Sequence, residues 1–207
     1  MLVGETFSKI TSLYDKVNAP LYGDAGTATL VEKGDFTTSY FELMSDGSGK
    51  DSVMIPAGEC RNPFSIENFR VEEQEDGNKR SGQQIYMNGM DVFNFALRVV
   101  PKSIKSVLER VDISLENLDY LIFHQANRFM TDFFVKKMKF DSRKVPYCLE
   151  RFGNTSSASI PLTIVSELKG KLDTKTKVVL CGFGAGLSWG TSYIEFQNCN
   201  VSSLIEY

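Results

Sequence analysis

The chain has 207 residues, enough for one domain or for one large half of a two-part fold, and its 42% apolar and 24% charged residues exclude the disordered and fibrous classes. Its net charge of −3 gives no broad positive field to hold a polyanion, so nucleic acid is not an expected partner. The apolar runs are short and the sequence opens without a basic region ahead of an apolar stretch, so we expect a cytoplasmic protein with no membrane span.

Two strands are predicted near the start of the chain. Residues 27–32 alternate small or apolar with polar side chains, as a strand does, and the turn Lys33-Gly34-Asp35 follows. Residues 37–44 are rich in Thr, Tyr and Phe and are predicted to pair with the first strand as its antiparallel neighbour. Residues 45–82 are polar and interrupted by glycine and proline, which indicates an excursion outside the core, either a variable surface loop or a specificity lid.

A long helix, a buried strand and a second helix are predicted next. Residues 90–111 carry apolar side chains at helical spacing, and Pro101 is predicted to kink this helix or to split it in two. The apolar run of residues 120–123 indicates a buried strand. Asn127 is predicted to open a helix that ends near Phe140.

The last third of the chain is predicted to form one more helix and two strands. The helix begins near Thr155 or Ser156 and ends near Leu168. The strands cover residues 175–181 and 188–196 and are joined by a glycine-rich turn. This order of helices and strands favours an α/β layered fold.

Three short segments could carry chemistry. His124, the sole histidine, directly follows the predicted buried strand, where ligands bind in open α/β sheets, although a hydrogen-bonded structural histidine is the alternative. Asn154 can donate an uncharged amide hydrogen bond, or it can be an ordinary helix cap. The turn Gly182-Phe-Gly-Ala-Gly186 could present backbone N–H groups to an oxyanion, or it could be only a tight hairpin. It lacks the spacing of a dinucleotide site and leads into a strand.

The cysteines predict neither a metal site nor a nucleophile. Cys60, Cys148, Cys181 and Cys199 are widely spaced, with no C-x-x-C pair and no histidine beside them, so we expect reduced thiols. None has the small-residue setting at a helix N-terminus that would lower a thiol pKa.

The three segments together resemble the C-terminal signatures of β-ketoacyl-acyl-carrier-protein synthase III, a condensing enzyme of the thiolase fold. The signatures are His124-Gln-Ala-Asn127, Gly153-Asn-Thr-Ser156 and Gly182-Phe-Gly-Ala-Gly-Leu-Ser-Trp-Gly190. Upstream, Tyr22-Gly-Asp-Ala-Gly-Thr-Ala28 is similar to the family's entry into its second half, and Met87-Asn-Gly-Met-Asp-Val-Phe93 resembles the start of its substrate-tunnel helix. The resemblance implies a thiolase-like α-β-α fold with a mixed sheet, of which this chain is the C-terminal half.

The resemblance also implies roles for single residues. His124 and Asn154 would donate hydrogen bonds to the thioester carbonyl of malonyl-acyl-carrier protein and stabilise the enolate as carbon dioxide leaves. The backbone N–H of Ala185, where the family usually has glycine, would help to form the oxyanion hole for the acyl-cysteine thioester. The implied pantetheine and acyl tunnel is lined by Met87, Gly89, Phe93 and Asn127, and the implied carrier-protein contact, for which a solvated helix face is the alternative, is made by Lys136 and Lys137. The resemblance implies acyl-CoA and malonyl-acyl-carrier protein as substrates and implies no cofactor.

The family's cysteine nucleophile belongs to the N-terminal half, and Leu2-Val-Gly-Glu-Thr-Phe7 resembles the strand that follows it. We therefore expect residues 1–196 to form the C-terminal thiolase-like domain, with 1–23 a remnant of the preceding half and 197–207 an unassigned tail. The expected function is an acyltransferase of fatty-acid or related biosynthesis that is inactive without its N-terminal half and is a homodimer at full length.

A non-catalytic binding or scaffold module that pairs with a full-length synthase is the alternative. In either case, the isolated chain is expected to expose apolar surface and self-associate.

Overall fold

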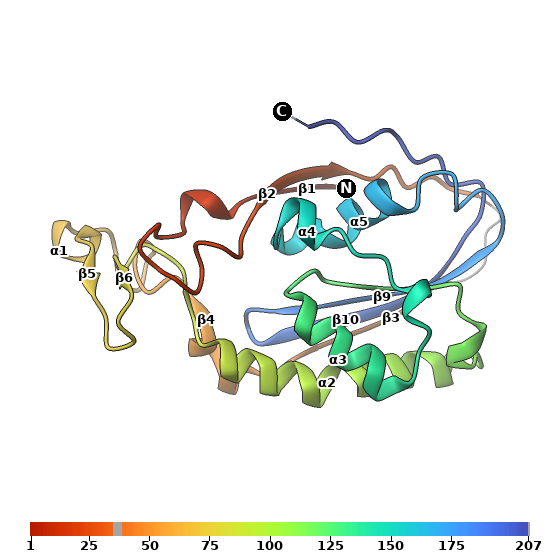
Figure 1. The fold of residues 1–207 in the computed structure, drawn as a ribbon, viewed down its shortest axis with the longest axis horizontal. Coiled ribbons are helices and arrows are strands. Elements are labelled where there is room, and N and C mark those ends of the chain that lie inside the picture. The colour runs from red at the N-terminus through yellow and green to blue at the C-terminus, as the bar shows by residue number, and fades with distance from the viewer. Residues whose placement is uncertain (35–38, 207) are drawn as a thin grey trace.

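The computed structural model describes residues 1–34 and 39–206, and a four-stranded mixed sheet lies at its centre (Figure 1). The strand order is β3-β10-β9-β8, where β8 and β9 are parallel and the other neighbours are antiparallel. The strands are β3 (Tyr40–Ser45), β8 (Tyr120–Phe123), β9 (Thr176–Gly184) and β10 (Ser188–Phe196). The last three confirm predicted strands, although β9 continues into the glycine-rich segment and leaves only residues 185–187 for the turn.

Helices cover both faces of the sheet (Figure 1). Helices α2 (Gly89–Arg110) and α3 (Arg128–Met138) pack on one face, and α5 (Ser159–Glu167) packs on the other. Side chains of β8 alternate between the faces, so Leu121 and Phe123 join the core under α2 and α3, while Ile122 joins the cluster under α5. A ribbon of β1 (Leu2–Thr6) and β2 (Asp24–Ala28) lies over α5, which is thus sandwiched between the ribbon and the sheet.

The predicted pairing of residues 27–32 with 37–44 is wrong. Strand β2 ends at Ala28 and pairs with β1, whereas β3 pairs with β10. Residues 35–38, which include part of the predicted turn and of the second strand, lie outside the described residues. The physical reason lies in α2, because Ser103 and Ser106 on that helix donate hydrogen bonds to Glu42 of β3, at 2.9 and 2.6 Å. These contacts favour β3 at the edge of the main sheet over a local hairpin.

Helix α2 runs unbroken through Pro101, which therefore does not split it. Proline has no backbone N–H, so the carbonyl of Leu97, four residues earlier, lacks its usual helical donor. The ammonium group of Lys137 on α3 donates to that carbonyl at 3.3 Å. Helix α3 begins as predicted, with Asn127 accepting from the Met130 N–H at 2.8 Å, and ends at Met138, near the predicted end.

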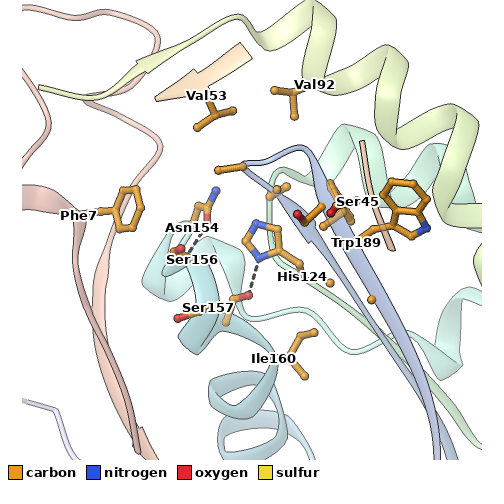
Figure 2. A pocket seen from close by; sticks show the side chains of 18 of the residues that line it. Phe7, Ser45, Val53, Val92, His124, Asn154, Ser156, Ser157, Ile160 and Trp189 are labelled. Atoms are coloured by element: carbon orange, nitrogen blue, oxygen red, sulfur yellow. Dashed lines mark hydrogen bonds between the residues drawn. The ribbon is translucent and has the colours of Figure 1, made fainter. Parts of the chain in front are cut away.

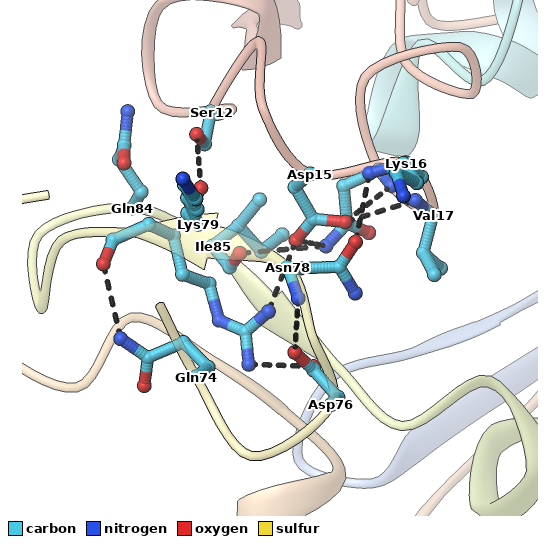
Figure 3. Close-up of polar contacts among 12 residues, drawn as sticks. Ser12, Asp15, Lys16, Val17, Gln74, Asp76, Asn78, Lys79, Gln84 and Ile85 are labelled. Atoms are coloured by element: carbon cyan, nitrogen blue, oxygen red, sulfur yellow. Dashed lines mark hydrogen bonds and ion pairs between the residues drawn. The ribbon is translucent and has the colours of Figure 1, made fainter. Parts of the chain in front are cut away.

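The predicted excursion of residues 45–82 lies outside the two main apolar clusters, but a buried polar network anchors it (Figure 3). The Arg80 side chain, 9% exposed, pairs with Asp15, 1% exposed, at 3.3 Å and with Asp76 at 2.8 Å. Asp15 also accepts from the Asn18 side chain at 2.9 Å. The elements here are β4 (Val53–Met54), α1 (Ile66–Phe69), β5 (Glu72–Glu73) and β6 (Lys79–Arg80), and β4 pairs with β7 (Tyr86–Met87).

The remaining elements are short. Helix α4 (Leu149–Phe152) precedes α5. Short 3-10 segments are Phe7–Lys9, Leu115–Asn117, Ser142–Lys144, Ser156–Ala158 and Gly47–Ser52, the last of which is kinked at Gly49. The tail beyond residue 196 packs back on the domain, since Glu206 pairs with Arg151 at 2.9 Å. The division of the chain at residues 23 and 196 stays a prediction. No helix in the described ranges is long and apolar enough to cross a membrane.

Candidate active site

A cavity of about 700 Å³ opens where β8 ends and α5 begins (Figure 2). This volume lies in the range of small-molecule sites. Apolar walls are provided by Phe7, Tyr22, Val53, Val92 and Trp189. The polar side chains on the cavity include His124 and Asn154 and the serines Ser45, Ser156, Ser157, Ser159 and Ser188. The two side chains predicted from the sequence to be catalytic, His124 and Asn154, are 30 positions apart and yet line the same cavity.

His124 is held by its backbone and by one side of its ring. Its N–H donates to the carbonyl of Cys181 at 2.8 Å, which continues the pairing of β8 with β9. Its Nδ1 lies 2.7 Å from the Ser159 Oγ, and its ring meets the Phe183 ring edge-on at 5.5 Å. Burial lowers the pKa of the imidazole from 6.5 to about 4, against a smaller opposing effect of the Ser156 backbone. The side chain is therefore neutral at pH 7.

Asn154 is fixed so that its amide nitrogen faces the cavity. Its backbone N–H donates to the Leu21 carbonyl at 2.9 Å, and its own carbonyl accepts from Gly23 at 3.0 Å. The side-chain Oδ1 accepts the Ser156 N–H at 2.9 Å, which leaves Nδ2 toward the open space between Phe7 and His124 (Figure 2). Nδ2 has no hydrogen-bond partner among the described residues. One end of the Asn154 amide therefore accepts from the backbone, and the other end offers a donor to the cavity.

Two glycines allow this segment to approach the start of the chain. A Cβ placed on Gly23 would lie 1.9 Å from the Phe152 carbonyl oxygen, so no other residue fits there without a shift of the backbone. Gly153 has φ +66°, which favours glycine, and a Cβ there would lie 2.9 Å from the Leu21 carbonyl oxygen. The glycine-rich stretch after Tyr22 therefore supports the position of Asn154.

The arrangement places a neutral imidazole and a neutral amide on the same cavity. Such groups can stabilise negative charge that develops on a bound carbonyl oxygen, because preorganised dipoles in a partly dry site act strongly and need not reorganise. Neither group brings a formal charge that would bind a carboxylate in its ground state. The pair is therefore suited to a reaction in which a carbonyl becomes an enolate or an oxyanion.

The predicted backbone donor and the residues predicted to bind substrate are placed in different ways. Ala185 lies on the exposed tip of the β9–β10 hairpin and lines the cavity. Met87, Gly89, Phe93 and Asn127 are not part of the cavity lining. Met87 accepts a hydrogen bond from Tyr22, Gly89 begins α2, Phe93 stacks on Phe129, and Asn127 caps α3. Their role in a tunnel stays a prediction.

Lys136 and Lys137 are exposed in the last turn of α3. Lys137 makes the bond to the Leu97 carbonyl described above, so part of its role is structural. Carrier-protein binding by this pair stays a prediction. Arg128, at the other end of α3, is held by Asp132 and Glu150.

None of the four cysteines lines the cavity in the described part of the chain. Burial raises the pKa of Cys181 to about 12 and also raises the pKa of Cys148 and of Cys199. Cys60 is exposed on the excursion. The described residues contain no group of three or more His, Cys, Asp or Glu side chains that could hold a metal ion.

Sequence reasoning missed several residues of the site. Ser159 lies three positions after Ser156, so helical spacing could have placed both on the face toward His124. Val92 is one position from the predicted tunnel residue Phe93. Phe7 and Val53 come from segments far away in the sequence, and no local pattern indicates that they would meet His124.

Comparison with known proteins agrees with the resemblance seen in the sequence. Residues 108–196 match the family model "3-Oxoacyl-[acyl-carrier-protein (ACP)] synthase III C terminal". The β-ketoacyl-[acyl-carrier-protein] synthase III proteins of Clostridium acetobutylicum and Lactococcus lactis are 36% and 35% identical to the chain, over 95% and 92% of it. The chain spans 58% and 57% of their lengths.

Solved structures give the same result. A 3-oxoacyl-(acyl-carrier protein) synthase from Burkholderia xenovorans superposes with a TM-score of 0.87 at 33% identity, over 100% of this chain and 58% of that one. A 3-oxoacyl-(acyl-carrier-protein) synthase III superposes with a TM-score of 0.86 at 36% identity, over 94% of this chain and 59% of that one. The predicted α/β fold with a mixed sheet is confirmed. The chain is thus related to the C-terminal part of 3-oxoacyl-acyl-carrier-protein synthase III, in the thiolase-like superfamily.

Proposed function

We propose that this chain supplies the decarboxylation site of a condensing acyltransferase that joins a malonyl group on acyl-carrier protein to an acyl-CoA primer. The observation that carries the proposal is the pair of neutral groups, His124 and Asn154, on one cavity. The proposed setting is fatty-acid or related biosynthesis in the cytoplasm. The active full-length protein would be a homodimer.

In this reaction the bond between the malonyl Cα and its carboxylate breaks, and carbon dioxide leaves. The electron pair passes to the thioester carbonyl oxygen, where the Nε2 of His124 and the Nδ2 of Asn154 stabilise the enolate by hydrogen bonds. The enolate carbon then attacks an acyl thioester held on a cysteine, and the thiolate leaves. The Ala185 backbone N–H would stabilise the oxyanion formed in that attack.

The nucleophilic cysteine is proposed to come from a segment equivalent to the N-terminal half of the similar synthases. Support comes from the cysteines of this chain, since the three with raised pKa values lack thiolate character and Cys60 lies away from the cavity. The chain alone is therefore proposed to be inactive. Lys136 and Lys137 remain the proposed contact for the acidic carrier protein, and Met87, Gly89, Phe93 and Asn127 the proposed tunnel.

The test is release of carbon dioxide from malonyl-acyl-carrier protein by the full chain combined with the N-terminal half of a similar synthase. Asn154→Asp keeps the shape and the oxygen that accepts from Ser156 but removes the N–H donor, so we expect release to fall by about 100-fold or more. His124→Ala should have a similar effect. Asn117→Ala, an exposed asparagine remote from the cavity, is the matched control and should leave release unchanged.

Two outcomes would contradict the proposal. Release that persists in both His124→Ala and Asn154→Asp would remove these residues from the reaction. Absence of release from a stable wild-type assembly would favour a non-catalytic module that pairs with a full-length synthase.

A further inference from the structure

The side chain of Tyr22 lies beside the Asn154 amide on the cavity and has no part in the proposed decarboxylation. The backbones of the two residues form a parallel bridge. It is held by bonds from the Asn154 N–H to the Leu21 carbonyl at 2.9 Å and from the Gly23 N–H to the Asn154 carbonyl at 3.0 Å. Residues directly opposite each other in paired backbones extend their side chains to the same face. Tyr22 and Asn154 both line the cavity, so the face they share is the one toward it.

Further contacts fix where the Tyr22 side chain runs. Its ring stacks on the Phe7 ring, with 4.8 Å between the centroids and 29° between the planes. Its hydroxyl reaches the Met87 Sδ at 3.9 Å, and Met87 is the register partner of Val53 in the β4–β7 pair. Phe7, Val53 and Asn154 surround the same opening (Figure 2). The Tyr22 side chain therefore extends from the Asn154 backbone toward the part of the wall that β4 provides.

The ring of Tyr22 belongs to the apolar wall, but its hydroxyl has unused hydrogen-bonding capacity. A phenol has one proton to donate and two lone pairs with which to accept. Its hydrogen-bond partner among the described residues is the Met87 sulfur, and a thioether is a weak acceptor. Burial, with a smaller effect of the Asp15 carboxylate, raises the pKa of Tyr22 to about 12, so the hydroxyl keeps its proton at pH 7. An oxygen atom on a ligand is a better partner than the sulfur.

We propose that Tyr22 is a specificity-determining residue that favours acyl thioesters with an oxygen substituent on the β-carbon over plain alkyl thioesters of the same length. The thioester carbonyl meets Asn154 and the substituent meets the Tyr22 hydroxyl, because the two side chains stand next to each other on one face. The apolar side chains of Phe7 and Val53 pack on the carbon chain. This substrate class rests on the proposed function, in which Asn154 receives a thioester carbonyl.

The test is equilibrium binding of two N-acetylcysteamine thioesters, β-hydroxybutyryl and butyryl, to the full 207-residue chain. Trp189 is the sole tryptophan and lines the cavity, so its fluorescence reports occupancy. We expect the wild-type chain to bind the β-hydroxybutyryl thioester about tenfold more tightly, the upper end for one neutral hydrogen bond. Tyr22→Phe keeps the ring that stacks on Phe7 and removes only the hydroxyl, so it should bind the two thioesters with similar dissociation constants.

Tyr147→Phe is the matched control, because Tyr147 is also half-buried but donates its hydroxyl proton to Asp132 and does not line the cavity. It should keep the wild-type preference. A wild-type chain that binds both thioesters equally, or neither, would overturn the proposal even if Tyr22→Phe failed to fold, and so would a preference that persists in folded Tyr22→Phe. Binding needs neither the nucleophile nor release of carbon dioxide, so the preference can be absent while decarboxylation succeeds, and the reverse.

Discussion

Removal of the buried charge of Arg80 is expected to destabilise the protein strongly. In Arg80→Met the side chain keeps an unbranched apolar stem, while Asp15, 1% exposed, loses its charged partner. Breaking a buried ion pair from one side typically costs about 3–5 kcal/mol. Asp15 would still accept from the backbone of Val17 and from the backbone and side chain of Asn18, so we expect the lower end, about 3 kcal/mol.

The assay is urea unfolding, with Lys79→Met as the matched control on the same strand. Lys79 pairs with Glu73 at 3.9 Å, and both side chains are more than half exposed, so its loss should change the free energy of unfolding by less than about 1 kcal/mol. Asp15→Asn should lower the free energy of unfolding by less than Arg80→Met does, because Arg80 keeps its ion pair with Asp76. The double variant should show a coupling of about 1 kcal/mol or more. Equal losses in the free energy of unfolding for Arg80→Met and Lys79→Met would refute the reasoning.

Two further predictions concern the active-site region. Because the pKa of His124 is lowered in the folded protein, the unfolded chain takes up a proton at a higher pH than the folded protein does. The stability that the neutral ring contributes is therefore full above pH 6.5 and declines as the pH falls toward 4, by at most about 3 kcal/mol. Urea midpoints measured between pH 7 and 4.5 should show this decline, and His124→Gln should make it smaller. Gly23→Ala forces a Cβ against the Phe152 carbonyl oxygen and should lower the free energy of unfolding by about 2 kcal/mol or more. Gly26→Ala, which has open space around its Cβ, should be tolerated. Similar melting temperatures for the two glycine variants would contradict the packing described.

The parts of the fold that sequence predicts well are those with a strong local pattern. The apolar run of β8, the helical spacing of α2 and the cap at Asn127 each depend on neighbours within a few positions. The pairing of β3 with β10 does not, because its partner lies about 150 residues away. A local hairpin is the simpler reading of that part of the sequence, and only contacts such as Glu42 with Ser103 exclude it.

The candidate site shows the same division. His124 and Asn154 were found because they stand in short motifs whose residues must be of particular types. Ser159 was not, since a serine at the start of a helix has an ordinary explanation as a polar residue of the first turn. The walls made by Phe7 and Val53 depend on how the first residues and the excursion fold back on the sheet. Such contacts are set by tertiary packing and leave no local signal.

We propose that this chain holds the decarboxylation site and that the nucleophile lies on another segment. The direct measurement is the intact mass of both chains after the wild-type chain and the N-terminal half of a similar synthase are incubated together with acetyl-CoA, and again after malonyl-acyl-carrier protein is added. We expect one acyl group on the N-terminal half only, which malonyl-acyl-carrier protein discharges with the wild-type chain but not with Asn154→Asp. An acyl group on this chain that disappears when one of its own cysteines is replaced would contradict the claim.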